Sequence, residues 1–207
     1  MQEKKTNNYI FLYICTRNVK KQVDEMDIDK RIENLLEQLD PITLEEMSSI
    51  RLMNRTDKKF VTNKVQLASL LELAQGKYYA QFNAGSKIAS YRTTYWDTED
   101  HHFYMDHHNG RAPRQKVRVR TYMDSGVTFL EVKTKNNPRR TRKKRIGLET
   151  YDASKVSLHP GTAEPGVGDF LSQRLDVPAA SLVPQLEDSF NRITLVNNDR
   201  TERLTID

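Results

Sequence analysis

The sequence predicts an α+β fold, with helices in the first third of the chain and an antiparallel sheet in most of the remainder. Apolar residues recur at helical spacing up to Gly76, and beyond it they alternate with polar residues. Short turns with Asn-Gly or Ser-Gly tips separate the later segments, which is typical of antiparallel hairpins. A chain of 207 residues is long enough for one domain with its own core.

Residues 1–25 are assigned to an N-terminal extension outside the fold, and residues 26–207 to a single domain. The apolar run at 9–15 has seven residues, whereas a membrane helix needs about 20. A signal peptide is the alternative for this segment, although basic residues follow where small cleavage-site residues are needed. Cys15 is the only cysteine, which excludes an internal disulfide framework. We therefore expect a cytoplasmic protein with no membrane span.

Three helices are predicted before Gly76, where the spacing of apolar residues changes from helical to alternating. Residues 28–39 carry an apolar stripe that ends before a proline. Thr43 and Glu46 have the spacing of a capping box and begin the second helix. Asn63 and Gln66 repeat that signature before the third, which a glycine ends.

Strands are predicted wherever apolar and polar residues alternate along the chain. Residues 152–187 interrupt them with Pro, Gly and Ser, and we expect two short helices there, near 168–175 and 181–187. The predicted strands cover residues 78–83, 87–97, 103–106, 115–123, 127–135, 141–149, 188–196 and 201–207.

The net charge of +5 conceals a strong asymmetry. Residues 111–145 hold 13 Lys and Arg against Asp124 and Glu131, a net charge of +11. The rest of the chain holds 20 basic and 26 acidic residues, a net charge of −6. A generally basic protein would spread its charge, so we expect the function to lie in this segment.

Alternation within the basic segment predicts a two-stranded cationic surface. In residues 116–122 the even positions are Lys, Arg or Tyr and the odd positions are apolar or β-branched. Residues 130–135 repeat the pattern after an Asp-Ser-Gly turn. The pair therefore presents one carboxylate, Glu131, among five cations: Lys116, Arg118, Arg120, Lys133 and Lys135.

Two interpretations of this surface are open. A half-buried sheet can direct its charged face to water, but like charges opposite one another destabilise a ladder. A polyanion would offset that repulsion, and phosphates suit Arg and Lys. The run at 137–145 is either a nucleic-acid or nuclear-localisation tract or a further strand that adds Arg142 and Lys144 to the face.

Four histidines, His101, His102, His107 and His108, suggest a metal cluster at first sight. Adjacent residues on a strand point to opposite faces, so at most two of the four would converge. We therefore favour turn roles for them. The Gly166-Val167-Gly168 segment lacks the Lys-Ser/Thr of a phosphate-binding loop.

A series of segments, in order, resembles the VTC (vacuolar transporter chaperone) domain, a polyphosphate polymerase module of the triphosphate tunnel metalloenzyme (CYTH-like) superfamily. The resemblance covers about residues 40–207. The matching segments are residues 41–47, 52–60, 91–98, 103–104 with 107–110, 116–120, 129–135, 191–192 and 202–207.

The resemblance implies an antiparallel β-barrel whose inner faces form a basic tunnel. Such a tunnel binds ATP and inorganic polyphosphate with Mn²⁺ or Mg²⁺, and family members of known activity transfer the γ-phosphate of ATP to a polyphosphate chain. The alternatives are a non-catalytic module that binds polyphosphate, inositol phosphates or nucleotide, and nucleic-acid binding, which we do not expect. The implied phosphate ligands are Lys59, Arg118, Arg120, Lys133, Lys144, Arg192 and Arg203, of which Lys59, Arg118, Arg120 and Lys133 would be catalytic.

Glu131 has two possible roles under the resemblance. It can ligate the divalent metal as a hard oxygen donor, or it can neutralise a neighbouring cation across the sheet. The resemblance also implies further strands after Asp207, one with an acidic metal ligand, so we expect the barrel to be incomplete in this chain.

Overall fold

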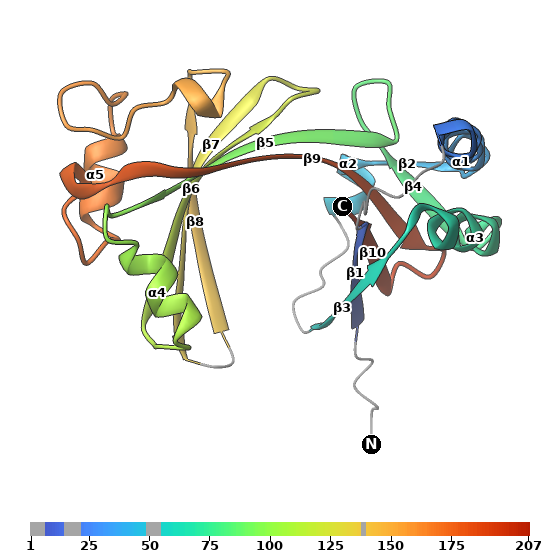
Figure 1. Ribbon diagram of the computed structural model, residues 1–207, viewed down its shortest axis with the longest axis horizontal. Helices are drawn as coiled ribbons and strands as arrows, with labels where there is room; N and C mark the ends of the chain where they lie inside the picture. Colours follow the sequence, from blue (N-terminus) through green and yellow to red (C-terminus); the bar gives the residue numbers. More distant parts are fainter. Residues whose placement is uncertain (1–6, 15–21, 49–54, 138–139) are drawn as a thin grey trace. The chain divides into compact units, whose positions relative to one another are not determined.

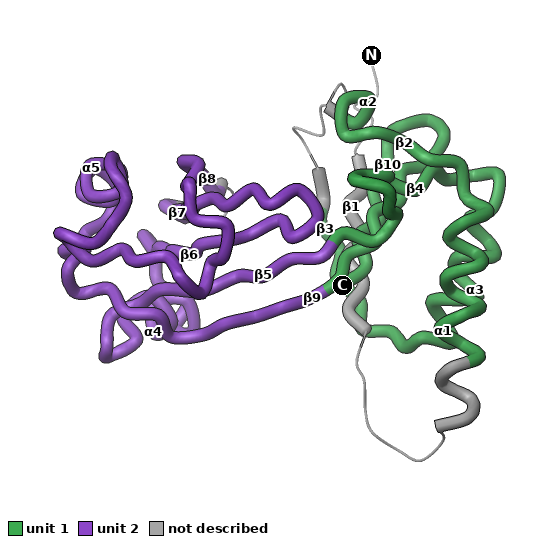
Figure 2. Tube along the Cα trace, turned by 90° about the horizontal axis from the view of Figure 1, so that it is seen from above, with its two compact units in different colours: residues 1–89, 191–207 green, residues 90–190 purple. Residues whose placement is uncertain are grey.

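The computed structural model describes residues 7–14, 22–48, 55–137 and 140–207. Its residues group into unit 1, residues 1–89 and 191–207, and unit 2, residues 90–190 (Figure 2). Both contain helices and strands, which confirms the α+β class. Cys15 and the Leu52–Asn54 part of the family resemblance lie outside the described residues. No helix in the described ranges is long and apolar enough to cross a membrane.

Unit 1 is a mixed sheet with α1 and α3 on one face (Figure 1). Its strands run in the order β3-β1-β10-β9, with β4 also paired to β9 and β2 paired to β4. Its elements are β1 (Asn7–Ile14), α1 (Gln22–Glu37), β2 (Pro41–Thr43), α2 (Leu44–Ser48), β3 (Arg55–Thr62), α3 (Lys64–Ala74), β4 (Tyr78–Phe82), the last part of β9 (Val183–Asn197) and β10 (Glu202–Ile206).

The core of unit 1 forms where α1 and α3 pack on the sheet. Leu36 of α1 and Leu71 of α3 lie in one buried cluster with Leu195 of β9 and Ile206 of β10. Each of these side chains is at most 2% exposed, so the helical stripes read from the sequence are the buried faces.

The predicted caps are present in unit 1. The Thr43 Oγ1 accepts from the Glu46 amide at 3.2 Å, and the Glu46 carboxylate accepts from the Thr43 amide at 2.8 Å. The Asn63 side chain accepts from the Gln66 amide at 2.9 Å. These bonds satisfy amides that the first turn of a helix leaves without partners.

Two strands of unit 1 differ from the sequence-based expectation. Residues 7–14, assigned to an extension outside the fold, form β1, which pairs in parallel with both β3 and β10. Residues 55–62, in the part expected to be mostly helical, form β3. A strand such as β1, which lies between two parallel partners, can be a continuous apolar run without alternation. The spacing of its apolar residues therefore does not identify it as a strand.

Unit 2 is an antiparallel sheet in the order β5-β6-β7-β8. Val119 and Leu130, both 0% exposed, lie in a buried cluster with Leu171 of the short helix α5. The elements are β5 (Ile88–Asp97), α4 (His102–His108), β6 (Arg114–Tyr122), β7 (Val127–Asn137), β8 (Arg140–Leu148), the 3₁₀ turns Ala153–Lys155 and Ala179–Ser181, α5 (Val167–Ser172) and the first part of β9.

Two predictions for unit 2 are wrong. Residues 103–106 belong to the helix α4, because the carboxylate of Asp97 accepts hydrogen bonds from the Phe103 and Tyr104 amides at 2.8 and 2.9 Å and caps the helix start. Residues 183–187, expected to be helical, begin the long strand β9. Four or five residues are too few for the apolar period to separate helix from strand.

Candidate phosphate-binding site

Alternate side chains of β6, β7 and β8 share one face of the sheet in unit 2. The register places Arg118 opposite Glu131, and Glu131 opposite Arg145. Positions two residues apart along each strand lie on the same face. We call the basic residues of this face the cationic face: Arg114, Lys116, Arg118, Arg120, Lys133, Lys135, Lys143 and Arg145.

Like charges meet directly across the ladder on this face. Lys133 lies between Lys116 of β6 and Lys143 of β8 in the register, and Arg114 lies opposite Lys135. Such pairs destabilise a sheet. The described residues of β6, β7 and β8 place a single carboxylate, Glu131, on this face. The arrangement therefore has a strong excess of positive charge that an anion would neutralise.

Glu131 is the buried centre of an ion-pair triad. Arg118 donates from Nε to Oε2 of Glu131 at 2.7 Å, and its Nη2 lies 2.5 Å from the same oxygen. The Lys143 ammonium donates to Oε1 of Glu131 at 2.9 Å. The carboxylate is 0% exposed, so both of its oxygens are held by cations away from water.

These contacts set the charge of Glu131. Burial by itself would raise the pKa of Glu131, but the charge of Arg118 and the hydrogen bonds from Lys143 and Arg118 outweigh it and lower the pKa to about 2. The group is an anion at every physiological pH. In the structure its two oxygens hold Arg118 and Lys143 in position.

In contrast to Glu131, Lys133 has surroundings that disfavour its charged form. Burial lowers the pKa of Lys133 to about 8, and the positive charges of Arg118, Lys143 and Arg120 add to that effect, while Glu131 opposes it. The negative charge of a phosphate beside the ammonium would oppose this shift and favour the protonated form. Lys133 is therefore the cation of this face whose charge depends most on an incoming anion.

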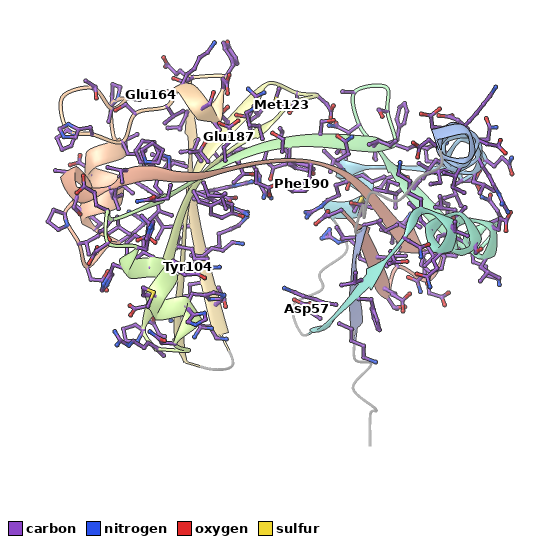
Figure 3. The ribbon with its side chains drawn as sticks, in the orientation of Figure 1. Asp57, Tyr104, Met123, Glu164, Glu187 and Phe190 are labelled. Carbon is purple, nitrogen blue, oxygen red and sulfur yellow. The ribbon has the colours of Figure 1, made fainter. Side chains whose placement is uncertain are left out.

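Arg120 is held between aromatic rings. Its Nε donates to Thr93 Oγ1 at 2.8 Å, and its guanidinium carbon lies 5.3 Å from the ring centre of Tyr91 and 5.2 Å from that of Phe190. Figure 3 labels Phe190 on β9, where it stacks on Tyr91 with ring centres 5.2 Å apart. Only 7% of Arg120 is exposed, so its orientation is fixed before any ligand binds.

The register of β8 differs from the sequence-based expectation. Lys144 lies opposite Val132, and Arg142 opposite Thr134, on the face that carries the core. The prediction that Arg142 and Lys144 join the cationic face is wrong, because a bulge between Lys135 and Asn137 shifts the pairing by one residue. Sequence reasoning missed the two cations that do lie there, Lys143 and Arg145.

The remaining predicted ligands, Lys59, Arg192 and Arg203, lie in unit 1. Through β1, the register aligns Lys59 of β3 with Thr205 of β10, which pairs with Thr194 of β9. Arg203 and Arg192 lie two residues before those threonines. All three therefore share the face of the unit 1 sheet opposite α1 and α3.

Arg192 already has a carboxylate partner. Its Nε and Nη2 lie 2.5 and 2.6 Å from the two carboxylate oxygens of Asp207. This fork-to-fork geometry is the one that a guanidinium also uses for phosphate. A phosphate at Arg192 must therefore compete with Asp207.

A dedicated metal centre is not evident in the described part of the chain. Those residues contain no group of three or more His, Cys, Asp or Glu that could hold a metal ion. Both oxygens of Glu131 are occupied by Arg118 and Lys143. The donor set around Glu131 is thus cationic and does not fit a divalent metal.

Known proteins share parts of this sequence and fold. Residues 54–207 match the VTC domain. Among solved structures, the chain is similar to a provisionally assigned adenylate cyclase from Bacillus halodurans, with 16% identity and a TM-score of 0.41 over 64% of each chain. It is also similar to one from Vibrio parahaemolyticus, with 10% identity and a TM-score of 0.31 over 52% of this chain and 45% of that one. The chain spans less than two thirds of either structure. None of the curated protein sequences matches it.

Proposed function

The chain belongs to the VTC domain family, and on that premise we propose that the cationic face binds the phosphates of ATP and inorganic polyphosphate for phosphoryl transfer. In the reaction, a terminal oxygen of the polyphosphate chain forms a new bond to the γ-phosphorus of ATP. The bond between that phosphorus and the β,γ-bridging oxygen breaks, and ADP leaves. Phosphoryl transfer needs positioning and charge neutralisation more than covalent help from the protein.

The excess of positive charge on the cationic face carries this proposal. Eight cations and one carboxylate lie on three adjacent strands, and the carboxylate is already paired. An ordinary solvated face would intersperse Asp and Glu. A linear polyanion laid on the face would relieve each of its like-charged pairs.

The described contacts give different members of the face different tasks. Arg118, held by Glu131, and Arg120, held between Tyr91 and Phe190, are orienting groups with fixed geometry. Lys133 is a point charge that becomes more firmly protonated when phosphate binds. Preset donors of this kind stabilise developing charge without reorganising.

The roles of Lys59, Arg192 and Arg203 as phosphate ligands are proposals from the family resemblance. Use of Mn²⁺ or Mg²⁺ has the same origin. A divalent ion supplies charge neutralisation on the phosphates when it is bound.

Calorimetric titration with tripolyphosphate tests the binding step. We expect Lys133→Gln to weaken binding by about tenfold, since a hydrogen bond to a charged group contributes about 1.5–3 kcal/mol. Lys155 is an exposed lysine of unit 2 outside the face and gives the matched control, Lys155→Gln. An equal loss in both variants, or no binding by the unaltered chain, would refute the proposed site.

A non-catalytic phosphate-binding module is the second candidate, because the excess of positive charge on the cationic face accounts for binding of a polyanion and does not by itself require turnover. Turnover separates the two functions. If the chain is a polymerase, ATP with Mn²⁺ or Mg²⁺ should yield new polyphosphate and ADP, at a rate that Lys133→Gln lowers. Tight tripolyphosphate binding with no ADP released would leave the binding module.

A further inference from the structure

An aromatic pocket borders the cationic face at the start of α4. It has a volume of about 510 Å³, within the range of small-molecule sites. All of its lining residues belong to unit 2. Six rings line it: Tyr95, Trp96, His101, Phe103, Tyr104 and His107.

The pocket shares a residue with the cationic face. Lys116 lines the pocket and lies opposite Lys133 in the register of β6 and β7. Tyr95, another lining residue, lies opposite Arg118. A ligand in the pocket would thus extend directly onto the basic residues that the proposed function assigns to phosphates.

The charge of the pocket differs from that of the face. Two carboxylates, Asp97 and Asp188, line it together with the single lysine Lys116. A polyanion is therefore favoured on the face and disfavoured in the pocket. The group that suits the pocket is flat, aromatic and uncharged.

The wall formed by α4 is held in place before any ligand binds. Asp97 accepts hydrogen bonds from the amides of Phe103 and Tyr104, and Phe103 is 3% exposed in the core of unit 2. Tyr104, labelled on α4 in Figure 3, stacks on His108 with ring centres 6.0 Å apart. Tyr104 as a whole remains 59% exposed and is accessible to a ligand.

We propose that this pocket binds the nucleobase of a nucleoside triphosphate whose phosphates lie on the cationic face. The inference rests on the proposed function, because the phosphates are what place the base at Lys116. It extends that function by separating the two ligands: ATP would use both the pocket and the face, and polyphosphate only the face. Stacking on aromatic side chains contributes about 1–3 kcal/mol per base.

Trp96 provides a direct probe of the pocket. It is the only tryptophan in the sequence and it lines the pocket. We expect ATP to change the fluorescence of Trp96 and tripolyphosphate, at the same occupancy, to leave it nearly unchanged. Identical changes with both ligands would overturn the assignment of the base to this pocket.

Substitution of Tyr104 supplies the second test. Tyr104→Ala should weaken ATP binding by about 5- to 20-fold, as loss of one stacking partner predicts, and leave tripolyphosphate binding within about twofold. Tyr104→Phe keeps the ring and should retain ATP binding. Tyr151→Ala is the matched control, because Tyr151 is 77% exposed in the same unit and outside the pocket.

The outcomes distinguish this inference from the proposed function. If Tyr104→Ala stays folded, an equal effect on ATP and tripolyphosphate, or no effect on either, overturns the pocket and leaves phosphate binding intact. Failure of the unaltered chain to bind either ligand overturns both. Unfolding of Tyr104→Ala would appear as lost tripolyphosphate binding, and the fluorescence comparison on the unaltered chain then decides.

Discussion

At the scale of single residues, Lys133 and Glu131 show how neighbours set the charge of the cationic face. Burial lowers the pKa of Lys133 to about 8, whereas two cations hold the pKa of Glu131 at about 2 in spite of burial. One group can therefore respond to ligand within the physiological range, and the other is permanently charged. Each property gives a separate prediction.

The affinity for tripolyphosphate should fall as the pH rises through 8. In the free protein Lys133 loses its proton near that pH, but bound phosphate favours the charged form and raises the pKa again. Binding above pH 8 then requires uptake of a proton, and affinity decreases by up to about tenfold per pH unit. Lys133→Arg stays charged and should remove this part of the dependence, as measured by titration between pH 7 and 10. A parallel slope in both proteins would contradict the prediction.

Glu131 should stabilise the fold above about pH 4.5, and that contribution should be lost as the pH falls from 4.5 towards 2. The pKa of this group is lowered in the folded state, so the unfolded chain takes up its proton first. The difference from the ordinary glutamate pKa of 4.5 corresponds to about 3 kcal/mol. Urea unfolding of Glu131→Gln should show this loss at pH 7 and a flatter acid dependence.

The exposed residue Glu99 gives the control for that measurement. Glu99→Gln should leave the unfolding free energy within about 0.5 kcal/mol of the original. If Glu131→Gln were equally mild, Glu131 would not be the anchor of Arg118 and Lys143.

At the scale of elements, the bulge at the end of β7 decides which side of β8 faces the cationic surface. Without it, the pairing of Asn137 with Arg140 would continue to Lys135 with Arg142 and Lys133 with Lys144. The single extra residue instead places Lys143 opposite Lys133. One local irregularity thus reverses every side chain of the strand.

Adjacent lysines of β8 should therefore behave differently. We expect Lys143→Ala to weaken tripolyphosphate binding by about tenfold or more, because it removes a cation from the face, where charged hydrogen bonds contribute about 1.5–3 kcal/mol. Lys144 lies on the opposite face, so Lys144→Ala should leave the affinity for tripolyphosphate within about twofold of the original. Calorimetry measures both constants, and the reverse ranking would favour the register without the bulge.

At the scale of the whole chain, charge is segregated by position in the sequence. Residues 111–145 carry +11 and the remainder −6, so a polyanion is attracted to one segment and repelled by most of the others. The ordered spacing of the cationic face suits a single flexible chain of phosphates. A rigid duplex presents its phosphates on a broader surface.

Tripolyphosphate should therefore bind more tightly than short duplex DNA. We expect a competition experiment at about 0.15 M salt to need at least tenfold more DNA, counted as phosphate, to displace half of a labelled polyphosphate. Salt must be held fixed because both affinities depend on it strongly. Equal competition by DNA would favour the nucleic-acid interpretation of residues 137–145.

The sequence by itself determined the class of the fold and most of the strands of unit 2. Strict alternation at residues 116–122 places Arg118 and Arg120 on one face whatever surrounds them, because successive side chains of a strand point to opposite sides. The caps at Thr43 and Asn63 are also local, since each depends on a residue three positions away. Features that depend on such short distances along the chain can be read without a structure.

Tertiary structure alone decided the rest. The bulge that selects Lys143 over Lys144 depends on how β7 meets β8, and the strand at residues 7–14 exists through its pairing with β3 and β10. The aromatic pocket depends on the Asp97 cap that turns residues 102–108 into a helix. Hydrogen bonds between segments set the register and the side that each residue faces, and periodicity within one segment does not contain that information.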